Sequence, residues 1–239
     1  MSPGSDPRGR SRGKRVKVRT AKGRKASSTR WLQRQLNDPY VAEAKRLGYR
    51  SRAAFKILWL DEKYKLFKRG SVVVDLGAAP GGWTQIAAEK LGRKGQLLAV
   101  DILEMEPVVG ARLLRLDFMG ENAEEKLLDE VKGPVDVVLS DLANSATGHR
   151  QTDHLRTMAL CEAAHQFAAK VLREGGTFVA KVLQGGTEAG LLAALKSDFK
   201  TVRHAKPPAS RAESTELYVV AQGFRRRNDG PAAGPEKSP

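Results

Sequence analysis

The sequence predicts an α/β fold in which a parallel sheet carries helices on both faces. Short runs of β-branched residues, such as VVVD at 72–75, alternate with longer amphipathic segments between two tails of different composition. Acidic residues also stand where several of these runs end, and open α/β sheets bind ligands at that edge. The chain has 239 residues, 41% of them hydrophobic, which is enough for one domain with one sizeable core.

The strands and helices follow from the hydrophobic pattern in chain order. The expected strands are 71–75, 96–101, 111–117, 134–141, 175–181, 199–204 and 216–222. The expected helices are 51–65, 82–91, 121–131, 153–172 and 187–197, several of which begin at Gly, Ser, Thr or Asp. Strands and helices alternate through most of this region, as the crossover units of a parallel sheet require.

Positive charge is concentrated near the N-terminus. Residues 1–30 contain eleven Lys or Arg and one acidic residue, out of a formal net charge of +15 for the chain. We expect residues 1–27 to be a disordered basic arm that binds phosphate backbones through counterion release, and residues 225–239 to be a disordered tail. A solubilising tail or a localisation signal is the alternative for the arm. Residues 28–224 are then the folded domain.

The composition argues against several other classes of protein. Cys161 is the single cysteine, so no internal disulfide can form, and the four histidines show no zinc-binding spacing. No apolar run is long enough to span a bilayer, and no apolar stretch follows the basic N-terminus as in a secretory signal. We therefore expect a cytoplasmic protein with no membrane or metal dependence.

Charged residues end five of the predicted strands. These residues are Asp75, Asp101, Asp117, Asp141 and Lys181. An Asp after a strand often only caps the next helix. Because four acids in succession are harder to explain in that way, we interpret them as a ring of acids around one small molecule at the carboxyl edge of the sheet.

The loop DLGAAPGGW, residues 75–83, has several possible ligands. A phosphate-binding loop needs a lysine where Trp83 stands, so it is excluded. A dinucleotide loop needs glycine where Ala79 stands, although Asp101 lies at a suitable distance to bind a ribose. S-adenosylmethionine has a ribose and cationic groups but no phosphate, so small residues and acids suit it. The pattern favours S-adenosylmethionine, with a purely structural glycine turn as the weakest alternative.

Five motifs in register resemble the FtsJ/RrmJ (RlmE) family of ribosomal RNA 2'-O-methyltransferases. They cover about residues 28–224 and read SSTRWLQRQLNDPYVAEAKRLGYRSRAAFKI, VVDLGAAPGGWTQ, VVLSDLA, FVAKVLQG and SRAESTELYVVA. The resemblance implies a Rossmann-like S-adenosylmethionine-dependent methyltransferase fold with a seven-stranded, mostly parallel sheet, its last strand antiparallel. It also implies methylation of a uridine ribose in large-subunit (23S) ribosomal RNA, on the assembled 50S subunit.

The resemblance further implies the site residues. The family's lysine-aspartate-lysine-glutamate tetrad falls on Lys56, Asp141, Lys181 and Glu216. Its cofactor contacts fall on Gly81, Trp83, Asp101, Asp117 and Asp141. Trp83 has a structural alternative, because it could fill a gap between a helix and the sheet.

One position departs from the family pattern. After LSD at 139–141 the family usually has Met-Ala-Pro-Asn, whereas this chain reads Leu142-Ala143-Asn144-Ser145. The proline that shapes this turn beside the target nucleotide is therefore missing. The four tetrad residues are all present, which argues for retained activity.

Two roles remain open for Lys181 in attack by a ribose 2'-hydroxyl. It acts as a neutral base, or it stays charged and stabilises the developing oxyanion. We expect Asp141 to orient Lys181, and Lys56 and Glu216 to position the ribose. Tyr218 either stacks on an RNA base or is a core tyrosine.

The predicted RNA surface combines the basic arm with residues near the start of the domain, namely Arg30, Trp31, Arg34, Arg50 and Arg52. An ordinary basic amphipathic helix is the alternative at 30–34. For the whole chain, the alternatives are a non-catalytic RNA-binding ribosome assembly factor and a nicotinamide-dependent oxidoreductase. We expect a monomer whose partner is the large-subunit ribosomal RNA or the 50S particle.

Overall fold

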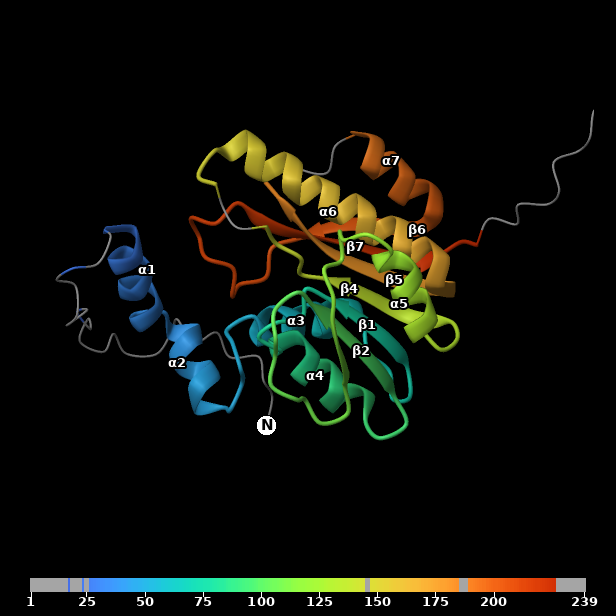
Figure 1. The fold of residues 1–239 in the computed structure, drawn as a ribbon, viewed down its shortest axis with the longest axis horizontal. Coiled ribbons are helices and arrows are strands. Elements are labelled where there is room, and N and C mark those ends of the chain that lie inside the picture. Colours follow the sequence, from blue (N-terminus) through green and yellow to red (C-terminus); the bar gives the residue numbers. More distant parts are fainter. Residues whose placement is uncertain (1–16, 18–22, 24–25, 145–146, 185–188, 227–239) are drawn as a thin grey trace, which may run out of the picture.

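A seven-stranded sheet organises the described part of the chain, which comprises residues 17, 23, 26–144, 147–184 and 189–226 of a computed structural model (Figure 1). The strands are β1 (Val72–Leu76), β2 (Gln96–Asp101), β3 (Arg112–Arg115), β4 (Val135–Ser140), β5 (Leu172–Leu183), β6 (Phe199–Ala205) and β7 (Glu216–Phe224). The helices are α1 (Ala26–Leu36), α2 (Pro39–Arg46), α3 (Ala54–Tyr64), α4 (Gly82–Leu91), α5 (Ala123–Glu130), α6 (Arg150–Val171) and α7 (Ala189–Asp198).

The strand order is β3-β2-β1-β4-β5-β7-β6. Strands β1 to β5 pair in parallel with their neighbours in this order, whereas β7 lies antiparallel between β5 and β6. The predicted mostly parallel sheet with an antiparallel last strand is therefore confirmed. Because β7 is inserted in the opposite direction, its first residues lie beside the carboxyl end of β5.

Helices cover both faces of the sheet, as predicted. Adjacent residues of a strand point to opposite faces, so Val73 packs with α3 and α4, while Val74 packs with α5 and α6. The core on the α3 side includes Ile57 and Ile86, and neither side chain is exposed to solvent. Figure 1 shows α5, α6 and α7 on the opposite side of the sheet from α3 and α4.

The register brings the predicted site residues to one edge of the sheet. Leu76 pairs with Ser140, which in turn pairs with Ala180. Asp141 and Lys181 therefore follow paired positions on neighbouring strands. In the antiparallel partner, Leu183 pairs with Glu216, so the first residue of β7 reaches the same edge.

The expected helices include neither α1 nor α2, although a basic amphipathic helix was the alternative at 30–34, within α1. Both segments are amphipathic but rich in Arg, Gln and Glu and poor in apolar residues, so the pattern does not mark them as core helices. Local signals define α2 instead: the Asp38 carboxylate accepts a hydrogen bond from Tyr40 N at 3.0 Å, and Pro39 opens the helix. The ring centroids of Tyr40 and Phe55 lie 5.4 Å apart, which attaches α2 to α3.

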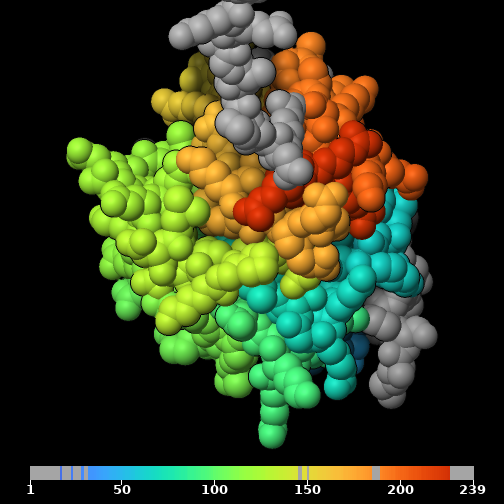
Figure 2. Space-filling model, turned by 90° about the vertical axis from the view of Figure 1, so that its right-hand side faces the viewer, coloured from blue at the N-terminus to red at the C-terminus, as the bar shows by residue number. Residues whose placement is uncertain are grey.

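The C-terminal strand is fixed to the rest of the domain along its length. Figure 2 shows the red end of β7 against orange residues of the same sheet. Gln222 donates to the backbone oxygen of Tyr64, at the end of α3, at 2.9 Å. The predicted disordered arm and tail fall largely outside the described residues and stay predictions. None of the described helices is long and apolar enough to cross a membrane.

Candidate active site

The loop after β1 runs close to backbone at the ends of two other elements. Gly77 has a φ of +78°, and a Cβ atom there would lie 2.7 Å from the backbone nitrogen of Leu142. A Cβ on Gly82 would lie 2.3 Å from Ser51 Oγ. Both glycines are therefore required for close packing, Gly77 against the turn after β4 and Gly82 against the start of α3.

The same packing defines the turn after β4 that lacks the family's proline. Asp141 N donates to the backbone oxygen of Leu76 at 2.9 Å, and Leu142 is half-buried against the core beneath α6. This first part of the turn is therefore held by Gly77 and Leu76 without a proline. Residues 145–146 lie outside the described residues.

Asp101 and Asp117 hold the turns that follow their strands. The Asp101 carboxylate accepts from Ala79 N at 2.9 Å and from Leu103 N at 2.8 Å. Asp117 accepts from Met119 N at 3.0 Å. Each acid thus holds a loop or turn, and neither caps a helix as the alternative interpretation proposed. A carboxylate oxygen has more than one lone pair, so both acids can also accept cofactor hydroxyl or amino groups.

Asp75 is a buried carboxyl at the start of the loop, and the tetrad and cofactor-contact sets did not include it. Thr84 Oγ1 donates to its Oδ2 at 2.7 Å, while Oδ1 has no hydrogen-bond partner among the described residues. Burial raises the pKa of Asp75 to about 7, with the charges of Asp141 and Asp101 adding to the effect and the Thr84 bond opposing it.

These donor-side residues fit S-adenosylmethionine. An unpaired buried carboxylate oxygen and nearby acids are unfavourable without a positive charge, and this cofactor carries cationic sulfonium and amino groups. The close-packed glycine loop carries no lysine for a phosphate. Gly81, Asp101, Asp117 and Asp141 would be the residues that hold the cofactor.

Trp83 lies in the core. Its side chain is 2% exposed, its indole Nε1 donates to the backbone oxygen of Ala53 at 3.0 Å, and its ring centroid lies 5.4 Å from that of Tyr218. The indole thus fills the space between α3, α4 and the sheet, as the structural alternative described. A cofactor contact by Trp83 stays a prediction and would have to use its backbone.

Lys181 and Asp141 form the central ion pair of the site. Lys181 Nζ lies 3.0 Å from Asp141 Oδ1 and 2.8 Å from the backbone oxygen of the same residue. The side chains are 11% and 19% exposed, respectively, so the pair is largely removed from water but still reachable from one side. The prediction that Asp141 orients Lys181 therefore has a direct geometric basis.

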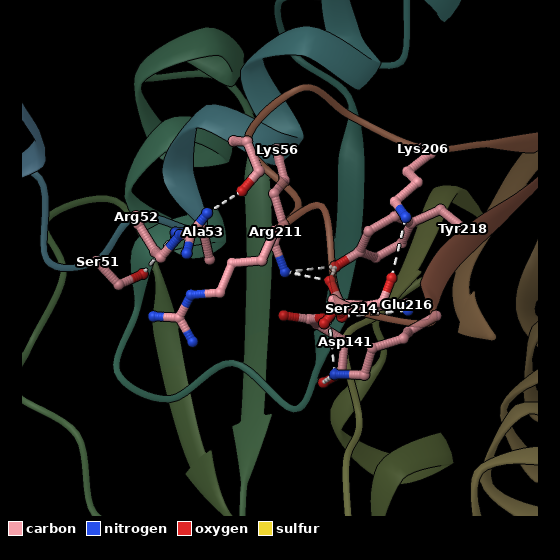
Figure 3. Close-up of polar contacts among 12 residues, drawn as sticks. Ser51, Arg52, Ala53, Lys56, Asp141, Lys206, Arg211, Ser214, Glu216 and Tyr218 are labelled. Atoms are coloured by element: carbon pink, nitrogen blue, oxygen red, sulfur yellow. Dashed lines mark hydrogen bonds and ion pairs between the residues drawn. The ribbon is translucent and has the colours of Figure 1, made fainter. Parts of the chain in front are cut away.

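The hydroxyl of Tyr218 connects this pair to the other two tetrad residues (Figure 3). It lies 3.0 Å from Asp141 Oδ1 and 2.8 Å from Glu216 Oε1. Lys56 Nζ donates to the same hydroxyl at 3.1 Å and forms an ion pair with Glu216 Oε1. The structure thus brings all four predicted tetrad residues together, with a fifth residue between them.

The network sets the protonation of its members. Burial alone would raise the pKa of Glu216, but the charges of Lys56 and Lys181, with hydrogen bonds from Lys56 and Tyr218, lower it below its ordinary value. Burial, followed by the charges of Asp141 and Glu216, raises the pKa of Tyr218 well above its ordinary value. Glu216 is therefore held as a carboxylate and Tyr218 as a neutral phenol.

Tyr218 has no exposed surface, so the suggestion that it stacks on an RNA base is wrong. It is the core tyrosine of the alternative, with its hydroxyl in the active site. The available signal was its position two residues after Glu216, because residues i and i+2 of a strand share one face.

A basic cavity of about 330 Å³ adjoins the tetrad on the α1 side. It is lined by Arg34, Gln35, Arg52, Lys56, Arg211, Glu213, Ser214 and Glu216. Arg52 and Arg211 both contact Asp38 Oδ2, and Arg52 also donates to the backbone oxygen of Ala209. Arg52 Nε and Arg211 Nη2 are buried and have no partner within the described ranges. Burial and the nearby Arg211 lower the pKa of Arg52, against the attraction of Asp38.

The predicted RNA-contacting residues divide into groups. Arg34 and Arg52 line the basic cavity, whereas Arg50 does not and instead contacts backbone oxygens near the cofactor loop. The side chains of Arg30 and Trp31 lie outside what the structure describes. Arg211 was missed, although it stands in the motif SRAES, because its position gave no periodic signal.

A second cavity of about 340 Å³ adjoins the tetrad on the α6 side. It is lined by Ala143, Asn144, Asp153, His154, Thr157, Lys181, Leu183, Gln184, Ser214, Thr215 and Glu216. His149, just before α6, caps that helix by accepting from Thr152 N at 3.4 Å. In the described part of the chain, no group of three or more His, Cys, Asp or Glu side chains is arranged to hold a metal ion.

Comparison with known proteins agrees with this geometry. Residues 49–224 match the FtsJ-like methyltransferase family. Proteins named ribosomal RNA large subunit methyltransferase E are 61% identical in Paramagnetospirillum magneticum, over 93% of both chains, and 59% identical in Rhodospirillum rubrum, over 98% of this chain and 90% of the relative. A crystal structure described as a ribosomal RNA methyltransferase of Plasmodium falciparum superposes with a TM-score of 0.66 at 29% identity, covering 74% of this chain and 98% of that one.

These matches agree with the predicted fold, cofactor and enzyme class. The family match spans most of the chain and includes β1 to β7, with all four tetrad residues. The high identity to relatives extends over nearly their whole length. The chain belongs to the FtsJ-like methyltransferase family, whose members transfer a methyl group from S-adenosylmethionine.

Proposed function

We propose that the protein methylates the 2'-hydroxyl of a uridine ribose in large-subunit (23S) ribosomal RNA, on the assembled 50S subunit. The observation that carries this proposal is the Lys181–Asp141 pair, joined through Tyr218 to the Lys56–Glu216 pair at the carboxyl edge of the sheet. The names of the relatives support ribosomal RNA as the substrate.

Asp141 lies between the cofactor loop and the residues proposed to act on the ribose. Its backbone follows β4 beside the cofactor loop, and its carboxylate contacts Lys181 and Tyr218. S-adenosylmethionine, when bound, supplies the methyl group and the sulfonium leaving group. The protein's part is to hold the ribose oxygen in line with that bond, which by itself contributes much of the rate enhancement.

The contacts of Lys181 are compatible with two proton arrangements. A neutral amine has two N–H bonds, which would donate to the backbone oxygen and to Oδ1 of Asp141. Its one lone pair would accept the hydroxyl proton. An ammonium has a third N–H bond, which would stabilise the developing oxyanion. The pH dependence of the methyl-transfer step distinguishes them: the rate rises with pH if the lone pair is required, and falls at high pH if the ammonium is required.

The RNA backbone is proposed to cross the basic cavity. Four cationic side chains line it, namely Arg34, Arg52, Lys56 and Arg211. Phosphate oxygens would interact with their positive charges from the cavity side. The target nucleotide would then enter between this cavity and the second one, where Ser214 and Glu216 line both.

Labelled S-adenosylmethionine tests this proposal. Incubated with the protein and 50S subunits that lack the modification, it should label 23S RNA at one uridine 2'-oxygen, with free 23S RNA as a poorer substrate. The reaction should be insensitive to EDTA at magnesium levels that preserve the subunit. RNA binding without transfer would support the assembly-factor alternative, and label on a base rather than on a ribose would disprove the 2'-O assignment. The proposal takes the enzyme to be cytoplasmic and monomeric. Light scattering checks its oligomeric state.

A further inference from the structure

The segment before α3 is attached to the cofactor side of the site. Gln85 of α4 binds it on both sides: Nε2 donates to the backbone oxygen of Gly48 at 3.0 Å, and Oε1 accepts from Arg50 N at 3.1 Å. This pair of bonds fixes the backbone around Arg50 next to the first turn of α4, directly after the glycine loop.

The guanidinium of Arg50 then bridges two loops. Nη1 donates to the backbone oxygens of Glu106 at 2.5 Å and Pro80 at 3.5 Å, and Nη2 donates to the backbone oxygen of Pro107 at 2.5 Å. Pro80 belongs to the glycine loop, whereas Glu106 and Pro107 belong to the connection between β2 and β3. Arg50 therefore ties these loops together through backbone atoms.

The contact of the two loops is close at Gly81, one of the predicted cofactor contacts. A Cβ on Gly81 would lie 2.9 Å from Met105 Sδ and 3.0 Å from Arg50 Cδ. The stem of Arg50 and the side chain of Met105 thus cover Gly81. Any shift of residues 105–107 would change the surroundings of this glycine.

Little apolar burial holds the β2–β3 connection in this position. Ile102, Leu103 and Val109 are 56%, 65% and 97% exposed, and Val108 is the one buried hydrophobic residue of 102–109. A segment with so few buried contacts needs polar bonds to stay in one conformation. The bonds from Arg50 are well suited, because a guanidinium can donate to several acceptors in one plane.

We propose that Arg50 is a positioning residue for the methyl donor: it holds the β2–β3 connection, residues 102–107, against the glycine loop and so forms one wall of the cofactor site. This differs from the RNA contact expected from the sequence. Arg52, two residues later, points instead to the basic cavity. The inference rests on the cofactor of the family and not on the identity of the RNA.

The test compares Arg50→Ala with Arg34→Ala, which removes an exposed arginine of the basic cavity. Calorimetric titration with S-adenosylhomocysteine, without RNA, should show about tenfold weaker binding for Arg50→Ala and no change for Arg34→Ala. Amide hydrogen exchange of residues 103–108 in the ligand-free protein should be faster only in Arg50→Ala. Arg34→Ala should instead raise the KM for RNA and lower its salt dependence.

Unchanged S-adenosylhomocysteine affinity and unchanged exchange in Arg50→Ala, together with weaker RNA binding, would overturn the inference. Arg50→Lys should recover only part of the affinity, because one ammonium cannot span the same oxygens. If Arg50→Ala does not fold, Arg50→Lys and Met105→Ala carry the test, since both should weaken cofactor binding more than RNA binding. Neither the titration nor the exchange measurement requires methyl transfer, so a failed rRNA assay leaves this test intact.

Discussion

The two halves of the active site are built in different ways. The donor half is a close-packed glycine loop and neighbouring turns, whose backbone atoms bond to the side chains of Asp101, Asp117 and Arg50. The acceptor half consists of side chains from distant parts of the chain that meet at the Tyr218 hydroxyl. Shape therefore limits substitutions in the donor half, and charge balance limits them in the acceptor half.

The largest effect is expected from breaking the acceptor half at its centre. Lys181→Ala removes the group that the proposed mechanism places next to the ribose 2'-oxygen and leaves Asp141 without its ion pair. Methyl transfer should fall by about 10³-fold, within the usual range for a proton-transfer or oxyanion-stabilising residue. Single-turnover assays with 50S subunits measure this.

The matched control for Lys181→Ala is Lys196→Ala, an exposed lysine of α7. It should keep the original rate. Affinity for S-adenosylhomocysteine should change little in either variant. Substantial turnover by Lys181→Ala would remove Lys181 from the catalytic role.

Adding a single methyl group at Gly77 should disrupt the donor half. Gly77→Ala would bring a Cβ within 2.7 Å of Leu142 N at a φ of +78°. We therefore expect the free energy of unfolding to fall by about 3–4 kcal/mol and cofactor binding to be lost. Gly133→Ala also changes a glycine of positive φ, +91°, but one with no neighbouring atom within 4 Å, and should lose about 1–2 kcal/mol. Urea denaturation measures both, and equal losses would show that the close approach is unimportant.

Asp75 should make the ligand-free protein sensitive to pH. Its pKa in the folded state is about 7, above the unfolded value, so the folded state holds a proton that the unfolded state has lost between these values. Stability should therefore fall as the pH rises from 5 towards 8, by about 2–3 kcal/mol relative to Asp75→Asn. Denaturation of both proteins at several pH values measures this. Parallel curves would show that Asp75 does not titrate there.

The smallest expected effect comes from Tyr218, and it tests whether the two ion pairs of the acceptor half act as one network. Tyr218→Phe keeps the buried ring but removes the hydroxyl that lies between Asp141 and Glu216. We expect about a tenfold lower kcat, with little change in the KM for S-adenosylmethionine, because hydrogen bonds to charged groups contribute about 1.5–3 kcal/mol and the lysines partly compensate. An unchanged kcat would show that the two ion pairs act independently.

Sequence reasoning found the residues whose position depends on strand ends. Asp141 directly follows β4 and Lys181 lies near the end of the neighbouring β5, so the parallel register brings them together without further information. Lys56 and Glu216 were found by family resemblance alone, because a lysine on a helix and an acid on a strand usually face solvent. Their pairing depends on the packing of α3 against β7, which no local pattern encodes.

The failures have related physical causes. The role of Tyr218 was left undecided between RNA stacking and the core because alternation gives the face of a strand but not what covers it. Helix α2 was missed because capping by Asp38 and packing of Tyr40 on Phe55 define it. Helix α1 was anticipated only as the basic-helix alternative at 30–34. Asp101 and Asp117 hold turns rather than cap helices, and each still has lone pairs for the cofactor contact that stays a prediction.

The antiparallel direction of β7 has a consequence for synthesis of the protein. The ribosome makes the cofactor loop first, and the chain must grow by well over a hundred residues before Glu216 and Tyr218 emerge and insert between β5 and β6. A nascent chain that has reached only β6 holds the donor half without the completed network. The network therefore cannot be complete until β7 has been made and has inserted between β5 and β6.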